Sequence, residues 1–142
     1  MNALQKSLLK AFVAGHVRLY QLSRGRIGGR IGTLPVALLT TTGRKTGKKR
    51  TVPLGSFEDQ GDVLVIASFG GSPEHPAWYN NLLANPTVAV QIGERAYEAR
   101  AEIVTGAERG RLWKMVVERA PNFAGYQKKT TREIPIVRLR RV

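Results

Sequence analysis

The segment TTTGRKTGKKR, residues 40–50, concentrates residue types that bind anions. Its two glycines enclose Arg44, Lys45 and Thr46, and three more cations complete it. Glycine lets backbone amides approach an anion, a threonine hydroxyl can donate to it, and guanidinium groups grip phosphate oxygens in pairs. Neighbouring cations also repel each other by roughly 1 kcal/mol per close pair. The segment therefore indicates either a phosphate-binding turn or a solvated hairpin turn, and charge alone does not separate the two.

A second group of candidate binding residues lies in ASFGGSPEHPAWYNNLLANP, residues 67–86. Ser68 ends a buried strand pattern and precedes glycines that let a flat ring approach the backbone. Trp78 and Asn81 are three residues apart on an expected helix, so an indole and an amide share one face and could contact a ring and a charged tail. The alternative is that Trp78 is a core residue and Asn81 lies near the helix end. We expect His75 to be structural rather than catalytic.

Positive charge is concentrated in the first part of the chain. The 142 residues include 23 Lys and Arg against 10 Asp and Glu, a formal net charge of +13. The first acidic residue is Glu58, so residues 1–57 carry only positive formal charges and should face an anionic partner. Nucleic acid is disfavoured as that partner. The basic segment has no aromatic residue for base stacking, and the chain has no helix-turn-helix or RNP-like pattern.

The chain contains no cysteine and two histidines. This composition excludes disulfides, a thiolate nucleophile and a zinc–thiolate site, and we expect no metal site. It also fits a reducing compartment. An oxidoreductase of this composition would need an organic cofactor to carry its electrons.

The first 22 residues form the pattern of an amphipathic helix. Its apolar stripe recurs every four residues, at Leu4, Leu8, Phe12, His16 and Tyr20. The segment is too short and too charged to span a bilayer, and it lacks the cleavage site of a signal peptide. A basic amphipathic helix can dock on its own domain or lie on an anionic membrane. The following glycine- and arginine-rich stretch, up to residue 34, predicts a flexible connection.

The remainder, residues 35–142, has the pattern of a mainly β (α+β) domain. We expect six strands, at residues 36–42, 50–57, 62–68, 87–93, 95–104 and 134–140. Two short helices are expected at residues 76–84 and 106–120. Because hairpins outnumber possible crossovers, the pattern predicts a six-stranded antiparallel barrel flanked by short helices and preceded by the amphipathic helix of residues 1–34. A Rossmann fold is disfavoured and the basic turn is not a Walker A loop, because neither glycine pattern matches.

Three ordered segments resemble one known family. TTTGRKTGKKRTVPL, ASFGGSPEHPAWYNNLLANP and YQKKTTREIPIV are similar to the deazaflavin-dependent nitroreductases of actinobacteria, whose members are split β-barrels. The resemblance implies an enzyme that transfers a hydride from reduced coenzyme F420 to a quinone, or to a nitro or enone acceptor. It also implies a cytoplasmic protein, peripheral on the inner face of the plasma membrane through residues 1–30. The alternatives are an FMN-binding split-barrel oxidoreductase and a non-catalytic carrier of F420 or lipid.

The resemblance also implies a set of site residues. The matching positions imply Arg44, Lys45, Thr46 and Arg50 as ligands of the phosphate and glutamate tail, Pro53, Leu54, Ala67 and Ser68 as neighbours of the deazaflavin, and Trp78 and Asn81 as helix contacts to the cofactor. Ser68 and Tyr126 are the expected catalytic residues. Ser68 would contact the ring, and Tyr126 would orient or protonate the acceptor. Tyr126 could instead be a packing residue.

The chain departs from the nitroreductase pattern mainly on the acceptor side. Phe69 stands where the nitroreductase has a lysine that contacts the tail, and Gly55 replaces a tyrosine. Of three tyrosines spaced three apart, Ala120 and Phe123 replace two, and only Tyr126 keeps its hydroxyl. We therefore expect turnover of quinones to exceed turnover of nitroimidazoles.

Overall fold

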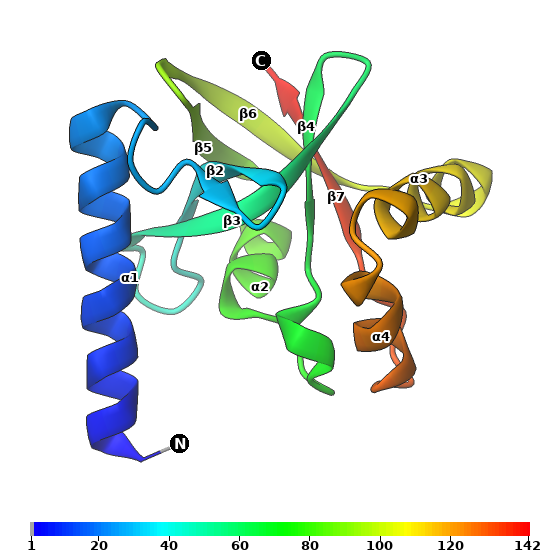
Figure 1. Ribbon diagram of the computed structural model, residues 1–142, viewed down its shortest axis with the longest axis horizontal. Coiled ribbons are helices and arrows are strands. Elements are labelled where there is room, and N and C mark those ends of the chain that lie inside the picture. Colours follow the sequence, from blue (N-terminus) through cyan, green and yellow to red (C-terminus); the bar gives the residue numbers. More distant parts are fainter. Residues whose placement is uncertain (1) are drawn as a thin grey trace.

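The computed structural model describes residues 2–142 as a β-barrel surrounded by helices. The helices are α1 (Ala3–Ser23), the short 3-10 turn η1 (Phe69–Gly71), α2 (Ala77–Ala84), α3 (Gly106–Arg119) and α4 (Asn122–Lys128). Figure 1 shows α1 on one side of the strands, α3 and α4 on the other, and α2 beneath them. Helices therefore cover two sides of the barrel and one of its ends.

All strand pairs in the described chain are antiparallel. The strands are β1 (Arg30–Ile31), β2 (Leu34–Thr42), β3 (Lys49–Asp59), β4 (Asp62–Ile66), β5 (Thr87–Ile92), β6 (Arg95–Ile103) and β7 (Ile136–Arg141). Their order is β1-β2-β3-β4-β7-β6-β5, and the additional pairing of β2 with β5 closes six of them into a barrel. This arrangement confirms the predicted six-stranded antiparallel barrel.

Apolar side chains at alternate strand positions fill the barrel interior, as the period of two requires. The interior cluster includes Ala37, Leu39, Val65, Val90, Ala99, Val137 and Leu139. Trp78, Tyr79 and Leu82 of α2 belong to the same cluster, so this helix closes one end of the barrel. Residues 97, 99, 101 and 103 of β6 share one face, because Ala99 belongs to this interior cluster and the other three pack against it.

Helix α3 and helix α4 cover the outer face of β3, β4 and β7. The cluster between them includes Phe57, Leu64, Ile136, Leu112, Val116 and Phe123. The sequence predicted no helix at residues 122–128. Helix α4 contains Gly125, and its N-cap Pro121 makes no side-chain capping bond, so its local propensity is weak. Burial of Phe123 against the barrel supplies what local propensity lacks.

Buried Arg138 of β7 connects three elements on this side of the barrel. Its guanidinium, with the whole residue 3% exposed, pairs with Asp59 at 2.8 Å, Asp62 at 3.2 Å and Glu108 of α3 at 2.8 Å. Hydrogen bonds from Arg111 and Arg138 lower the pKa of Asp59 to about 2. A buried cation is tolerated here because carboxylates surround it.

Helix α1 docks on the barrel only through its second half. Val17 and Tyr20 pack against Val36 and Leu38 of β2. The Tyr20 hydroxyl donates to the Val36 carbonyl at 2.8 Å and accepts from the Gly93 amide at 2.7 Å. The first half of the helix instead leaves four large apolar side chains exposed, Leu4, Leu8, Leu9 and Phe12.

The connection after α1 makes more defined contacts than its glycine content suggests. His16 donates from Nε2 to the Gly28 carbonyl at 2.7 Å, and the Gly29 carbonyl accepts from the Val36 amide at 2.9 Å. Strand β1 then pairs with the start of β2. Within residues 2–142, no helix combines the length and hydropathy needed to cross a bilayer.

Candidate functional site

The β2–β3 turn is closed by its own backbone. The Gly43 amide donates to the Lys48 carbonyl at 2.7 Å, and the Gly47 amide donates to the Gly43 carbonyl at 2.8 Å. The Thr46 hydroxyl accepts from the Lys48 amide at 3.2 Å. A Cβ atom at position 43 would lie 2.7 Å from the Thr46 hydroxyl and 3.2 Å from the Lys48 carbonyl, so this compact turn favours glycine there. The turn therefore presents its cations from a defined backbone.

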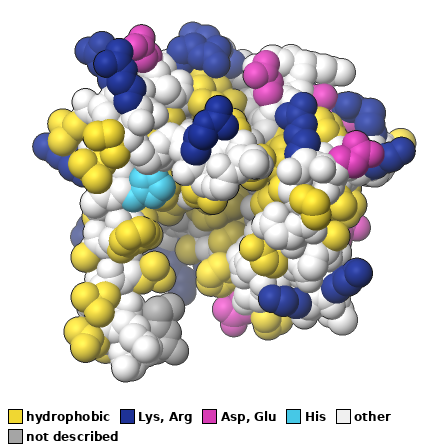
Figure 2. All heavy atoms as spheres, viewed as in Figure 1, with side chains coloured by type: hydrophobic (Ala, Val, Ile, Leu, Met, Phe, Trp, Pro, Cys, Tyr) yellow, Lys and Arg dark blue, Asp and Glu magenta, His cyan; other side chains and the backbone are white. Residues whose placement is uncertain are grey.

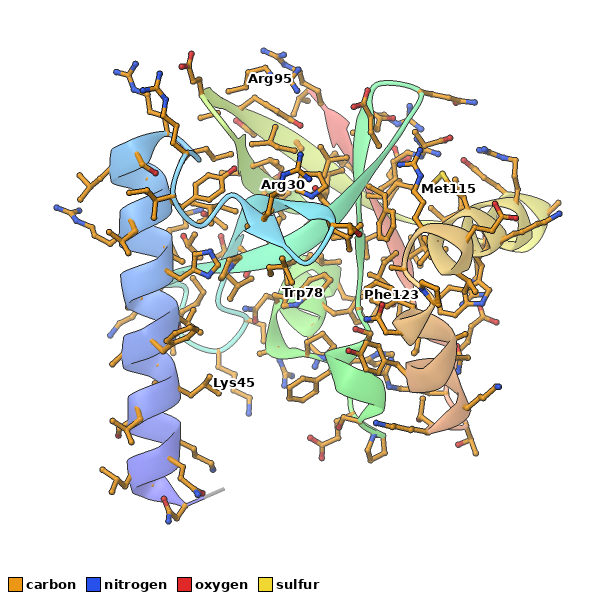
Figure 3. All side chains as sticks on the ribbon, in the orientation of Figure 1. Arg30, Lys45, Trp78, Arg95, Met115 and Phe123 are labelled. Carbon is orange, nitrogen blue, oxygen red and sulfur yellow. The ribbon has the colours of Figure 1, made fainter. Side chains whose placement is uncertain are left out.

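The cations of this turn are exposed and lack carboxylate partners. They are Arg44, Lys45, Lys48, Lys49 and Arg50, and none pairs with a carboxylate among residues 2–142. Lys49 donates to the Thr42 hydroxyl at 2.9 Å. Figure 3 shows Lys45 extending away from the barrel between α1 and α2. This local field is not neutralised by the described protein, which is the condition for binding a multivalent anion.

Asn81 of α2 holds the turn from behind. This side chain is buried, and its Nδ2 donates to the Thr41 hydroxyl at 3.1 Å while its Oδ1 accepts from the Arg44 amide at 3.1 Å. The amide is thus engaged with protein on both atoms. In this arrangement Asn81 shapes the backbone that presents Arg44, and direct contact with a cofactor tail stays a prediction.

The outer face of β3 lies next to the turn. Val52 and Leu54 pack in the barrel interior and Phe57 packs outside, so strand alternation turns Pro53 outward. Pro53 is partly exposed and is paired with Leu38 of β2. Figure 2 shows a hollow with a hydrophobic floor between α1 and the lobe that contains α4. Pro53 and Leu54, both expected beside the deazaflavin, therefore point to opposite faces of the strand.

Arg132 binds the loop that carries Ser68 through four polar contacts. Its guanidinium donates to the carbonyls of Ser68 at 2.8 Å, Ala67 at 3.1 Å and Ser72 at 2.9 Å. It also contacts Nδ1 of His75 at 3.2 Å. The backbone of both residues expected at the ring, Ala67 and Ser68, is therefore positioned by one side chain more than sixty residues away in sequence.

The contact with Arg132 favours the neutral form of His75. A guanidinium can only donate, so His75 Nδ1 must accept and cannot carry a proton. Burial, and then the charge of Arg132, lower the pKa of His75 below its ordinary value of 6.5. The ring also packs against Tyr79 with centroids 4.6 Å apart. These contacts agree with the structural role expected for His75.

Sequence reasoning assigned no role to Arg132, although it lies within the segment YQKKTTREIPIV. Gln127 fixes the backbone around it, because its Nε2 donates to the Arg132 carbonyl at 2.7 Å and its Oε1 accepts from the Ile134 amide at 2.9 Å. An arginine before a buried strand was the available signal. Its partners could not be known before the chain was folded.

Tyr126 of α4 lies next to the same loop. A Cβ atom at Gly71 would lie 2.6 Å from the Tyr126 carbonyl, so η1 and α4 are in direct contact. The Tyr126 ring packs edge-on against Phe123 with centroids 5.6 Å apart, and its hydroxyl accepts from Asn122 at 3.3 Å. The expected catalytic pair, Ser68 and Tyr126, therefore lies on elements that touch.

Trp78 is a buried residue of the barrel interior. It is 8% exposed, belongs to the interior cluster and packs edge-on against Tyr79 with centroids 6.4 Å apart. Figure 3 places it beneath β3, close to the hollow. This position matches the alternative of a core residue, and contact with a cofactor ring stays a prediction.

Comparison with known proteins assigns the chain to a family. The model of the F420H(2)-dependent quinone reductase family matches residues 13–140. The chain belongs to this family. The resemblance found in the sequence is therefore confirmed at the level of the deazaflavin-dependent enzymes. The match to the quinone reductase model begins at residue 13, so it includes the docked half of α1 and leaves out the exposed half.

Individual relatives support the same assignment. The chain is 42% identical over 130 residues to an F420H(2)-dependent quinone reductase of Mycobacterium tuberculosis, covering 89% of this chain and 87% of that protein. A solved F420-H2 dependent reductase (FDR-A) is 48% identical, with a TM-score of 0.68, covering 74% of this chain and 93% of the other. A second structure, described as a domain-swapped dimer, is 42% identical with a TM-score of 0.70 and covers 89% and 96%.

Proposed function

We propose that this protein is an F420H2-dependent quinone reductase that works as an enzyme with reduced coenzyme F420 as its hydride donor. The observation that carries the proposal is the un-neutralised cationic turn beside a hollow with an apolar floor, in a chain of the quinone reductase family. When bound, the reduced deazaflavin supplies the two electrons as a hydride. The protein supplies orientation and a site from which water is excluded.

The donor set of the turn fits the phosphate and glutamates of the cofactor. Arg44 and Arg50 offer paired N–H donors, Lys45 adds a mobile charge, and Thr46 adds a hydroxyl. Asn81 would act indirectly, by holding the backbone of Arg44 in place. The 3.1 Å hydrogen bond from the Arg44 amide to Asn81 Oδ1 supports this role. In this proposal the turn binds the charged end of the cofactor and leaves the ring to the strands.

The ring and acceptor ends of the proposed site come from neighbouring elements. Pro53 on the outer face of β3 would line the hollow, with Leu54, Ala67 and Trp78 supporting it from the interior. Ser68 would contact the ring, because it is partly exposed just after β4, in a loop held by Arg132. Tyr126, on the helix packed against that loop, would orient a quinone oxygen or donate its proton.

The first test is oxidation of F420H2 by menadione, together with fluorescence titration of F420. For Arg44→Ala and Lys45→Ala we expect the dissociation constant for F420 to rise about tenfold each, because each loses a charge-assisted contact. Lys114→Ala on α3 is the matched control, since Lys114 is exposed and outside the proposed site. Unchanged cofactor affinity in both turn variants would refute the clamp.

The same assay separates the alternative functions. A non-catalytic carrier would bind F420 but would not oxidise F420H2 with any quinone. An FMN enzyme would show FMN binding in a parallel spectral titration, with no response to F420. We also expect menadione turnover to exceed nitroimidazole turnover, and a reversed ratio would contradict the acceptor assignment.

We also propose that the exposed half of α1 binds the surface of an anionic membrane, where a lipophilic quinone would be found. Its large apolar side chains are 50–72% exposed, and the helix carries Lys6 and Lys10. This would make the protein peripheral on the inner face of the plasma membrane. The division of the chain into residues 1–34 and 35–142 likewise stays a proposal.

The membrane proposal is tested by sedimentation with phosphatidylglycerol vesicles. Deleting residues 1–30 would also remove buried Tyr20, so the sharper variant is Leu4→Ser, Leu8→Ser and Phe12→Ser combined. We expect this variant to lose most vesicle binding, whereas Leu83→Ser, which changes an exposed leucine on α2, should retain it. If the triple variant sediments with the vesicles like the parent, the membrane proposal is wrong. It is also wrong if the only effect of the three substitutions is to separate two copies of this chain that associate through α1.

A further inference from the structure

The end of the barrel opposite α2 is open and holds a separate cavity of about 480 Å³. Its wall includes Glu58 at the end of β3, Arg95 and Tyr97 at the start of β6, and Arg141 at the end of β7. Arg119, at the end of α3, completes the rim. Nothing in the proposed quinone reductase site uses any of these side chains.

Strand alternation explains why charged residues gather at this opening. On β7, Val137 and Leu139 face the interior, so Arg141 lies on the same face two residues further along. On β6, Tyr97 packs against the interior cluster, so Arg95 lies on that face as well. The interior is thus apolar at the α2 end and cationic at the open end.

The cavity combines this charge with an apolar wall. Val63 and Ile92 form part of its lining. Val63 belongs to the interior cluster, and Ile92 packs against that cluster. The Arg141 guanidinium lies 4.9 Å from the centroid of the Tyr97 ring, which orients it over an aromatic face. The cavity is of a size typical for small-molecule sites.

The charges at this opening are not balanced by the protein. Three arginines face one carboxylate, and within residues 2–142 none of Arg95, Arg119 and Arg141 forms an ion pair. The neighbouring Asp62 is already paired with Arg138 and Arg140. The open end therefore carries an unsatisfied positive charge above an apolar surface.

We propose that the open end of the barrel is a second binding site, for a small amphiphile with one anionic group and an apolar body. The anionic group lies between the guanidinium groups of Arg95 and Arg141, and the apolar body extends toward Val63 and Ile92. Arg119 limits the opening from the side of α3.

This site is distinct from the cationic turn. Strand β3 runs from the turn at Lys49 to the open end at Asp59, a length along the strand of about 30 Å at roughly 3.3 Å per residue. Figure 3 shows Arg95 above the barrel strands and Lys45 below them.

The test is an NMR titration of ¹⁵N-labelled protein with octanoate, in the presence of saturating F420. We expect shifts of the amides in residues 59–63 and 92–97, with octanamide, the uncharged analogue, binding at least about tenfold more weakly. For Arg95→Gln combined with Arg141→Gln, the dissociation constant for octanoate should rise at least about tenfold. Arg100→Gln, on the outer face of the same strand β6, is the matched control and should bind as the parent does.

Three results would overturn the proposal. Octanoate shifts confined to residues 43–54 would place binding at the turn instead. Equal affinities for octanoate and octanamide would remove the role of the arginines. Inorganic phosphate that reproduces both the shifts and the affinity would show that the apolar wall contributes nothing. Because Arg95 and Arg141 are exposed, the variants should keep the parent amide spectrum outside the cavity.

Discussion

At the scale of single residues, the proposed site depends on side chains that position backbone as well as on its exposed cations. Asn81 holds the amide of Arg44, and Arg132 holds the carbonyls around Ser68. A partly buried donor such as Arg132, which satisfies several carbonyls, is costly to remove because each carbonyl loses its partner. The proposed cofactor contacts therefore rely on residues that need not touch the cofactor.

Removing the guanidinium of Arg132 should affect both stability and cofactor use. For Arg132→Gln we expect a loss of about 1–3 kcal/mol in the free energy of unfolding, measured in urea, because charge-assisted bonds to carbonyls are lost. The KM for F420H2 should rise while far-UV circular dichroism stays that of the parent. Parent-like KM with lower stability would mean that the loop around Ser68 is not part of the cofactor site.

The burial of His75, and then the charge of Arg132 beside it, also predict a pH dependence of stability. The pKa of His75 is lowered in the folded protein, so the unfolded chain takes up this proton first as the pH falls. The stabilisation that neutral His75 gives to the folded protein is fully present above the ordinary pKa of 6.5. It is lost as the pH falls below 6.5 toward the lower pKa of the folded protein. Urea unfolding at pH 7.5 and pH 5.5 should show this decline, and His75→Gln should reduce it. An equal decline in that variant would assign the effect to other groups.

At the scale of elements, the close contact of η1 with α4 brings the two halves of the proposed catalytic site together. Gly71 has a φ of +84° and lies against the Tyr126 carbonyl, whereas Gly70 has a φ of +62° and faces open space. Both positions favour glycine for conformational reasons, but only one also needs its small size. The chain thus contains its own control for this contact.

Gly71→Ala should therefore lower activity far more than Gly70→Ala. In both variants alanine must adopt a left-handed backbone conformation, which lowers the free energy of unfolding by roughly 1 kcal/mol in each. Only Gly71→Ala forces η1 away from α4, so its kcat/KM with menadione should fall at least about tenfold further. Steady-state kinetics of the two variants, with thermal melts to compare their stabilities, measure this difference. Similar losses in both would mean that the contact does not position the reacting groups.

At the scale of the whole molecule, the distribution of charge separates the two proposed binding sites. The cationic turn lies at one end of β3 and the open cavity at the other, and residues 1–57 contain no acidic residue. Arg138, by contrast, is surrounded by carboxylates in the outer wall. Positive charge is therefore left unpaired at the two proposed anion sites, whereas the charge of Arg138 is neutralised by carboxylates.

This field predicts that cofactor binding depends on salt. The net charge of +13 attracts an anionic cofactor over a distance set by ionic strength, about 10 Å at 0.1 M and about 3 Å at 1 M. We expect the KM for F420H2 to rise several-fold between these conditions with little change in kcat. The variant Arg44→Ala should show a weaker dependence. A KM insensitive to salt would argue against an electrostatic clamp.

Much of the fold and part of the site could be predicted because they are encoded locally. Alternation of apolar residues predicted the six strands, and the four-residue repeat predicted α1. The glycine-enclosed cations of residues 40–50 predicted an anion site before any contact was known. The helix at residues 122–128 escaped prediction, because burial of Phe123 rather than local propensity stabilises it.

The sequence by itself therefore determined the strand pattern, the charged turn and the family resemblance. Only the tertiary structure decided which charges are paired, which half of α1 is docked, and that Arg132 holds Ser68. It also decided that Arg95 and Arg141 face one opening. The physical reason is that strand and helix periods depend on neighbouring residues, whereas these contacts join residues brought together only when the barrel closes.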